Sequence, residues 1–127
     1  MSEAATPRTL YLVRHGRAHE RGPDWPDDRL RPLTRDGVTR LKRIVGALAR
    51  RDVRIDLVLT SPLVRTVETA DVLSNGLADT PPVEEVSWLE PGAAVAAAQK
   101  GLTRFRSAER IALVGHEPDL GLLAAWL

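Results

Sequence analysis

The sequence feature that most constrains the fold is a short apolar segment, Leu10 to Val13, that ends abruptly at Arg14, His15 and Gly16. A near-continuous apolar run is typical of a parallel strand that is buried on both faces. In open α/β sheets, ligands bind just beyond the carboxyl ends of such strands. The segment therefore predicts a buried strand that carries Arg14 and His15 to a ligand site.

The same pattern occurs twice more along the chain. A second apolar run, 111–114, ends just before His116, and a third, 57–60, ends just before Ser61 and is followed by Arg65. The carboxyl ends of parallel strands lie at one edge of a sheet. We therefore expect two histidines and two arginines, from distant parts of the chain, to meet at that edge.

Helical patterns separate these strands. Apolar residues recur at helical spacing after Thr34, which suits an N-cap, and again after Ser61 and Pro62, where the serine is expected to cap the helix. Asn75-Gly76 predicts a left-handed stop for this second helix. We expect a further strand over 83–89 and further helices over 91–107 and 119–127. Alternating strands and helices predict an α/β fold, a three-layer α/β/α sandwich with a mostly parallel central sheet.

Composition narrows the class of protein. With 127 residues, 43% of them hydrophobic and 28% charged, residues 1–127 are expected to form a single globular domain. The formal net charge of +1 gives no reason to expect nucleic acid as a partner. No apolar stretch is long enough to span a membrane and the first residues do not resemble a signal peptide, so we expect a cytoplasmic protein. The absence of cysteine excludes a cysteine nucleophile and thiolate metal sites.

The residues at the strand ends suit phosphoryl transfer. Histidine has an unperturbed pKa near 6.5, and an adjacent arginine disfavours its protonated form, so His15 beside Arg14 is expected to be a neutral nucleophile. Arginine also offers a planar fork of donors that matches phosphate oxygens. Arg65 lies about one turn into a predicted helix, so its side chain can lean back toward an anion at the helix N-terminus. His116 would complete a cationic pocket around the phosphoryl oxygens.

Each residue also has a less specific interpretation. A single histidine at a strand end is usually structural, and Arg65 could instead pair with Glu68 or Asp71 on its own helix. His15 and His19 have the spacing of a helical metal pair, but Gly16 and the loop context argue against one, so no metal is expected. The joint placement of the four residues favours a shared function over these separate readings.

The chain resembles the histidine phosphatase superfamily, and within it the small SixA-type phosphohistidine phosphatases. The resemblance rests on Leu12 to Ala18 with its Arg-His-Gly motif, on Arg31-Pro32-Leu33-Thr34, on Ser61-Pro62 with Arg65, and on Val114-Gly115-His116. It implies a phosphoglycerate mutase-like fold that is short at its C-terminal end. It also implies that His15 is the catalytic nucleophile, and that Arg14, Arg65 and His116 hold the phosphoryl group. Arg31 and Ser61 are further candidates for substrate binding.

These observations predict a metal-independent phosphatase that acts through a phosphohistidine intermediate and needs no cofactor. The expected substrate is phosphohistidine on a protein such as a phosphotransfer domain, which would give the chain a role in signal transduction. A small-molecule phosphomonoesterase or mutase is the alternative within enzymes, and a phosphoryl-binding module without turnover is the alternative outside them. No general acid stands out among Glu90, Glu117, Asp27 and Asp28, which favours a P–N substrate because its leaving group needs a weaker acid.

The resemblance carries one departure at the C-terminal end. Relatives usually continue with further sheet and helix after the second histidine, whereas this sequence stops at Ala124-Ala125-Trp126-Leu127. An uncovered sheet edge is prone to pairing with another chain. Either this is a fragment or a natural short form, or the missing cover comes from another chain, and we expect reduced stability or self-association through the incomplete edge of the sheet.

Overall fold

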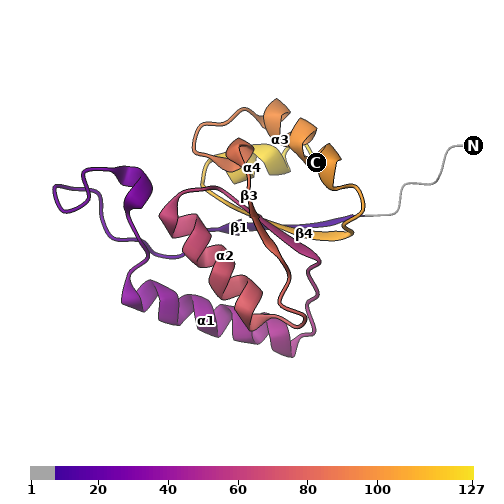
Figure 1. The fold of residues 1–127 in the computed structure, drawn as a ribbon, viewed down its shortest axis with the longest axis horizontal. Coiled ribbons are helices and arrows are strands. Elements are labelled where there is room, and N and C mark those ends of the chain that lie inside the picture. The colour runs from indigo at the N-terminus through magenta and orange to yellow at the C-terminus, as the bar shows by residue number, and fades with distance from the viewer. Residues whose placement is uncertain (1–7) are drawn as a thin grey trace, which may run out of the picture.

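The computed structural model describes residues 8–127 and has the predicted α/β/α architecture. Its four strands are β1 (Thr9–Arg14), β2 (Leu57–Thr60), β3 (Val83–Glu85) and β4 (Arg110–Gly115). They form one fully parallel sheet in the order β1-β4-β2-β3. Helices α1 (Arg35–Arg50) and α2 (Val64–Gly76) lie on one side of the sheet, and α3 (Val95–Leu102) and α4 (Asp119–Ala124) lie on the other (Figure 1).

Alternation along the strands builds a core on each face of the sheet. On β2 and β4, Val58 and Val114 pack under α1 and α2, whereas Leu59, Ile111 and Leu113 pack under α3 and α4. Successive side chains of a strand point to opposite faces, so two strands buried on both sides need the near-continuous apolar runs seen in the sequence. All five of these side chains are fully buried.

The first predicted helix is confirmed in detail. Thr34 is the N-cap of α1, and its hydroxyl accepts a hydrogen bond from the backbone N–H of Gly37 at 2.8 Å. Gly37 also lets the segment after β1 approach the helix, because a Cβ at this position would clash with the carbonyl oxygen of Arg17. The start of α1 is therefore packed against the loop that follows His15.

The prediction for the second helix is right about its existence and about its end at Gly76, and wrong about its cap and about a left-handed conformation at Gly76. The helix α2 begins at Val64 with Leu63 as its N-cap residue, so Ser61 does not cap it. The Ser61 hydroxyl instead lies 2.9 Å from a ring nitrogen of His116. Gly76 does not adopt a left-handed conformation, and its lack of a side chain serves the close approach of α2 to Val45 of α1.

Two later elements are shorter than predicted. The strand expected over 83–89 ends at Glu85, and a 3₁₀ turn, η2 (Ser87–Leu89), follows it. Trp88 and Leu89 pack into the core beneath α3, which takes the chain away from the neighbouring strand. The helix expected over 91–107 is confined to α3 and the turn η3 (Thr103–Phe105), and α4 ends at Ala124.

The strand order leaves β1 at one edge of the described sheet and β3 at the other. On β1, the side chains from Leu10 to Val13 face the two sides of the sheet in alternation and are only half-buried. None of the helices among residues 8–127 has the length and apolarity that crossing a membrane would require.

Candidate active site

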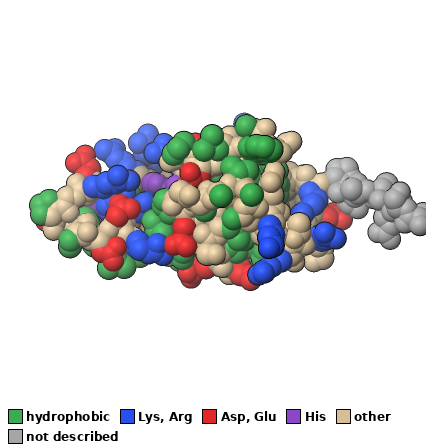
Figure 2. All heavy atoms as spheres, turned by 90° about the horizontal axis from the view of Figure 1, so that it is seen from above, with side chains coloured by type: hydrophobic (Ala, Val, Ile, Leu, Met, Phe, Trp, Pro, Cys, Tyr) green, Lys and Arg blue, Asp and Glu red, His purple; other side chains and the backbone are tan. Residues whose placement is uncertain are grey.

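The parallel sheet brings the predicted site residues together at its carboxyl edge. β4 lies between β1 and β2, so His15, His116 and the β2–α2 connection follow three neighbouring strands. They surround an open cavity of about 550 Å³. Its lining is rich in arginine and consists of Arg14, His15, Gly16, Arg17, Ala18, Arg21, Arg31, Arg65, Pro91, His116 and Glu117. In the space-filling view, histidine atoms reach the surface among basic side chains (Figure 2).

His15 is held with one ring nitrogen free. Its Nδ1 lies 2.6 Å from the carbonyl oxygen of Gly16, and because a carbonyl can only accept, Nδ1 carries the hydrogen and donates it. In the neutral ring the lone pair is then on Nε2. Burial lowers the pKa of His15, and Arg65, Arg14 and Arg31 lower it further, against the opposing effect of the Gly16 hydrogen bond. His15 is therefore neutral at pH 7 and can act as a nucleophile through Nε2.

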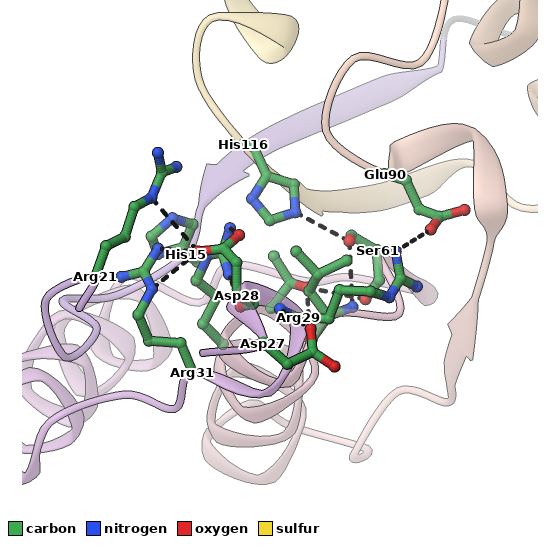
Figure 3. Close-up of polar contacts among 12 residues, drawn as sticks. His15, Arg21, Asp27, Asp28, Arg29, Arg31, Ser61, Glu90 and His116 are labelled. Atoms are coloured by element: carbon green, nitrogen blue, oxygen red, sulfur yellow. Dashed lines mark hydrogen bonds and ion pairs between the residues drawn. The ribbon is translucent and has the colours of Figure 1, made fainter. Parts of the chain in front are cut away.

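His116 faces His15 across the cavity. The two ring centroids are 5.4 Å apart, with the planes tilted by 57°. Burial lowers the pKa of His116 to about 4, with Arg65 and His15 adding to the effect. Its Nε2 and the Ser61 hydroxyl, which is itself fully buried, are 2.9 Å apart (Figure 3). His116 is thus a neutral and firmly oriented ring that can offer a single N–H to an anion.

Arg65 is the most deeply buried cation of the site. It lies in the first turn of α2 and is 3% exposed. Its Nη1 donates to the backbone oxygen of Asp28 at 2.9 Å, and its Nη2 lies 3.1 Å from the carboxylate of the same residue. Its Nε is buried and has no hydrogen-bond partner in the described part of the chain. A buried N–H without a partner is costly, so this group is suited to a ligand oxygen.

The remaining predicted residues differ in how they reach the cavity. Arg14 is exposed at the end of β1 and lines the cavity. Arg31 also lines it, but this residue is only 8% exposed, and its guanidinium donates to Asp28 and to the carbonyl oxygen of His19. Ser61 is not among the lining residues and contacts His116 from behind.

The four acidic candidates are separated by the structure. Glu117 lines the cavity, whereas Glu90 pairs with Arg29 at 2.6 Å and Asp27 accepts from the backbone N–H of Arg29. Asp28, in the turn η1 (Asp28–Leu30), contacts three arginines at once. The sequence identified Asp28 only as one of four possible general acids. The only local signal for its ion pairs is the i, i+3 spacing to Arg31.

The arrangement is that of an anion site built around a neutral imidazole ring. Five arginines and one glutamate line the cavity, so its potential favours anions. Among residues 8–127, no cluster of three or more histidine, cysteine or carboxylate side chains is arranged to hold a metal ion. The positive charge that this cavity offers to an anion is that of its arginine side chains.

Comparison with known proteins identifies the family. The family model of the histidine phosphatase superfamily (branch 1) matches residues 10–92, which include His15, Arg31 and Arg65. The chain belongs to this superfamily. Membership of it, together with the solved structures that the chain resembles, indicates that the protein is a phosphatase.

Three known proteins resemble the chain in sequence or in structure. An uncharacterized protein of Picosynechococcus sp. (strain ATCC 27264 / PCC 7002 / PR-6) is 38% identical over 115 residues, which cover 88% of this chain and 68% of that protein. A solved structure of the protein histidine phosphatase SixA complexed with tungstate is 25% identical, with a TM-score of 0.81 over 91% of this chain and 74% of that chain. The fold is also shared with the α-ribazole phosphatase from Shigella flexneri, at 22% identity and a TM-score of 0.69 over 92% and 78% of the two chains. The predicted SixA-type architecture is thus confirmed.

Proposed function

We propose that the chain is a metal-independent phosphohistidine phosphatase in which His15 accepts the phosphoryl group. The observation that carries this proposal is the geometry of His15. Its Nδ1 is tied to Gly16, so the lone pair is on Nε2, within a cavity that also holds His116 and the buried Arg65. A neutral imidazole surrounded by fixed cations suits in-line attack on a phosphoryl group, because the cations stabilise charge on the equatorial oxygens.

The reaction has two steps. In the first, Nε2 of His15 forms a bond to phosphorus while the bond from phosphorus to the substrate nitrogen breaks, and the departing imidazole takes up a proton. In the second, water attacks phosphorus, the bond to His15 breaks, and orthophosphate leaves. Arg14 and Arg65 would bind the phosphoryl oxygens in both steps, and His116 would donate one N–H to them.

Phosphohistidine is the preferred substrate for a chemical reason. Imidazole is a better leaving group than an alkoxide and needs a weaker proton donor. Of the four acidic candidates only the exposed Glu117 lines the cavity, so none of these four is a buried carboxylic acid placed to protonate a strongly basic leaving group. The similarity to SixA supports the same choice, with a phosphorylated protein as the partner.

The similarity to an α-ribazole phosphatase favours a second candidate, a small-molecule phosphomonoesterase. A substrate panel separates the two. We expect the wild-type chain to hydrolyse a histidine-phosphorylated phosphotransfer domain faster than sugar phosphates or aryl phosphates. Turnover of phosphoesters with none of the phosphoprotein would support the second candidate. Binding of orthophosphate without any turnover would favour a phosphoryl-binding module.

The panel needs two matched variants. His15→Ala is expected to abolish turnover of every substrate that the wild type accepts. His19→Ala removes a nearby ring that lies against Trp25 and is not among the cavity-lining residues, so it is expected to leave turnover unchanged.

We also propose that the chain self-associates through β1. This strand lies at an edge of the described sheet, where its outer backbone groups have no neighbouring strand. Size-exclusion chromatography with light scattering tests this: a dimer supports the proposal, and a monomer at high concentration refutes it.

A further inference from the structure

Asp28 occupies an unusual place beside the cavity. One oxygen of its carboxylate lies 3.1 Å from Nη2 of Arg65, and the other lies 3.0 Å from Nη2 and 3.1 Å from Nε of Arg31. A third arginine, Arg21, approaches to 3.4 Å (Figure 3). The backbone oxygen of Asp28 accepts a further hydrogen bond from Arg65. A single loop residue thus contacts three of the arginines that line the cavity, two of which, Arg65 and Arg31, are buried.

Arg65 and Arg31 are buried residues of the cavity lining, whereas Asp28 is not one of the lining residues. Arg65 is 3% exposed and Arg31 is 8% exposed, and both line the cavity that Asp28 does not. The Asp28 side chain, 44% exposed, contacts the guanidinium groups of both arginines. It leaves Nε of Arg65 without a partner among the described residues, as a donor for a ligand.

We propose that Asp28 is the positioning residue of the phosphoryl site, which orients Arg65 and Arg31 so that their free N–H groups meet the transferred phosphoryl group. This proposal deepens the function given above and rests on it. Two attachments to one residue, carboxylate and backbone oxygen, remove the rotation that a guanidinium would otherwise keep. The carboxylate also contacts both Arg65 and Arg31 and offsets the repulsion between these two like charges. A cation that is already oriented costs no reorganisation when charge develops on the phosphoryl oxygens.

A different role for Asp28 makes the opposite prediction. If the carboxylate only competed with phosphate for the arginines, its removal would strengthen phosphate binding. If it positions the arginines, its removal weakens phosphate binding even though a negative charge has been taken away. The direction of the change therefore decides between the two roles.

The test compares three variants with the wild type. Asp28→Asn keeps the shape and loses the charge, and Asp28→Glu keeps the charge and displaces it. Asp27→Asn is the matched control, because it neutralises the adjacent residue, whose side chain accepts only from the backbone N–H of Arg29 and contacts neither cavity arginine. Circular dichroism and thermal melting establish that each variant is folded. Orthophosphate affinity is measured by calorimetry, and kcat and KM are measured on the substrate that the wild type turns over fastest.

We expect Asp28→Asn to lower kcat by about 10- to 100-fold with a much smaller change in KM, since misplaced catalytic groups cost this much. Its orthophosphate Kd should rise about threefold or more. Asp28→Glu should fall between Asp28→Asn and the wild type in both readouts, and it keeps the test valid if Asp28→Asn does not fold. Asp27→Asn should match the wild type.

A folded Asp28→Asn variant with unchanged kcat, or with tighter orthophosphate binding, would overturn the proposal. An equal loss in Asp27→Asn would also overturn it, because the loss would then come from loop charge alone. If the wild type turns over no substrate, the proposed function fails separately. In that case weaker orthophosphate binding by Asp28→Asn still supports the positioning role, and unchanged or tighter binding refutes it.

Discussion

The pH dependence of stability tests the account of His116. Its pKa is lowered from 6.5 to about 4 in the folded chain, mainly by burial and also by Arg65 and His15. In the unfolded chain it returns to its ordinary value near 6.5. Between these values the unfolded state binds a proton that the folded state does not, so stability falls as the pH drops. Above about pH 6.5 the effect is absent, and below about pH 4 it no longer grows.

The size of the effect follows from the pKa difference. One pKa unit corresponds to 1.36 kcal/mol, so at pH 5 the proton taken up by His116 on unfolding costs the folded state about 2 kcal/mol. The pKa of His15 is lowered as well and shifts stability in the same direction. Replacing His116 with asparagine removes its share of the loss and keeps a group that can hydrogen-bond to Ser61.

The assay is urea unfolding of the wild type and of His116→Asn at pH 7.5, 6 and 5. The absolute stability of the variant is unimportant, because only the change with pH is compared. We expect the wild type to lose about 2 kcal/mol more than the variant between pH 7.5 and pH 5. Parallel losses in the two proteins would show that His116 titrates normally in the folded chain, and the reasoning about its burial would be refuted.

Three further substitutions separate activity from stability. Arg65→Lys keeps the charge and loses the planar fork, so kcat should fall by about 100-fold with little change in melting temperature; a kcat near that of the wild type would contradict the role of the fork. Gly37→Ala places a methyl group against the carbonyl of Arg17, so unfolding should become easier by about 1–3 kcal/mol and activity should fall with it; a more stable variant would show that helix propensity outweighs the clash. Leu59→Ala opens a cavity in the fully buried core under α3 and α4, and should cost about 2–5 kcal/mol in chemical denaturation while the folded fraction keeps its kcat.

The sequence was sufficient for the central part of the fold because its strongest signals are local. The apolar runs at 57–60 and 111–114 lie in strands that are almost wholly buried, and the run at 10–13 is half-buried at the sheet edge, so each has a clear strand pattern, and Thr34 caps α1 through its own hydroxyl. The convergence of His15, Arg65 and His116 followed from the parallel arrangement alone.

The errors arose where contacts between distant residues decide the outcome. Ser61 has the properties of a helix cap, but its hydroxyl lies within hydrogen-bond distance of the ring of His116, which is 55 residues further along the chain. The strand expected over 83–89 ends early because Trp88 and Leu89 pack beneath α3. Asp28 could not be assigned to Arg65, because 37 residues separate them and a carboxylate in a polar loop carries no local signal for its partner.

The central claim is that His15 carries the phosphoryl group during turnover. To test it directly, the wild type is mixed with its phosphorylated substrate and the reaction is stopped rapidly without acid. The protein is then analysed by mass spectrometry under neutral conditions. The account predicts an acid-labile phosphoryl group on His15 of the wild type and none on His15→Ala. Turnover by the wild type with no phosphoryl group on His15, or turnover that persists in His15→Ala, would contradict it.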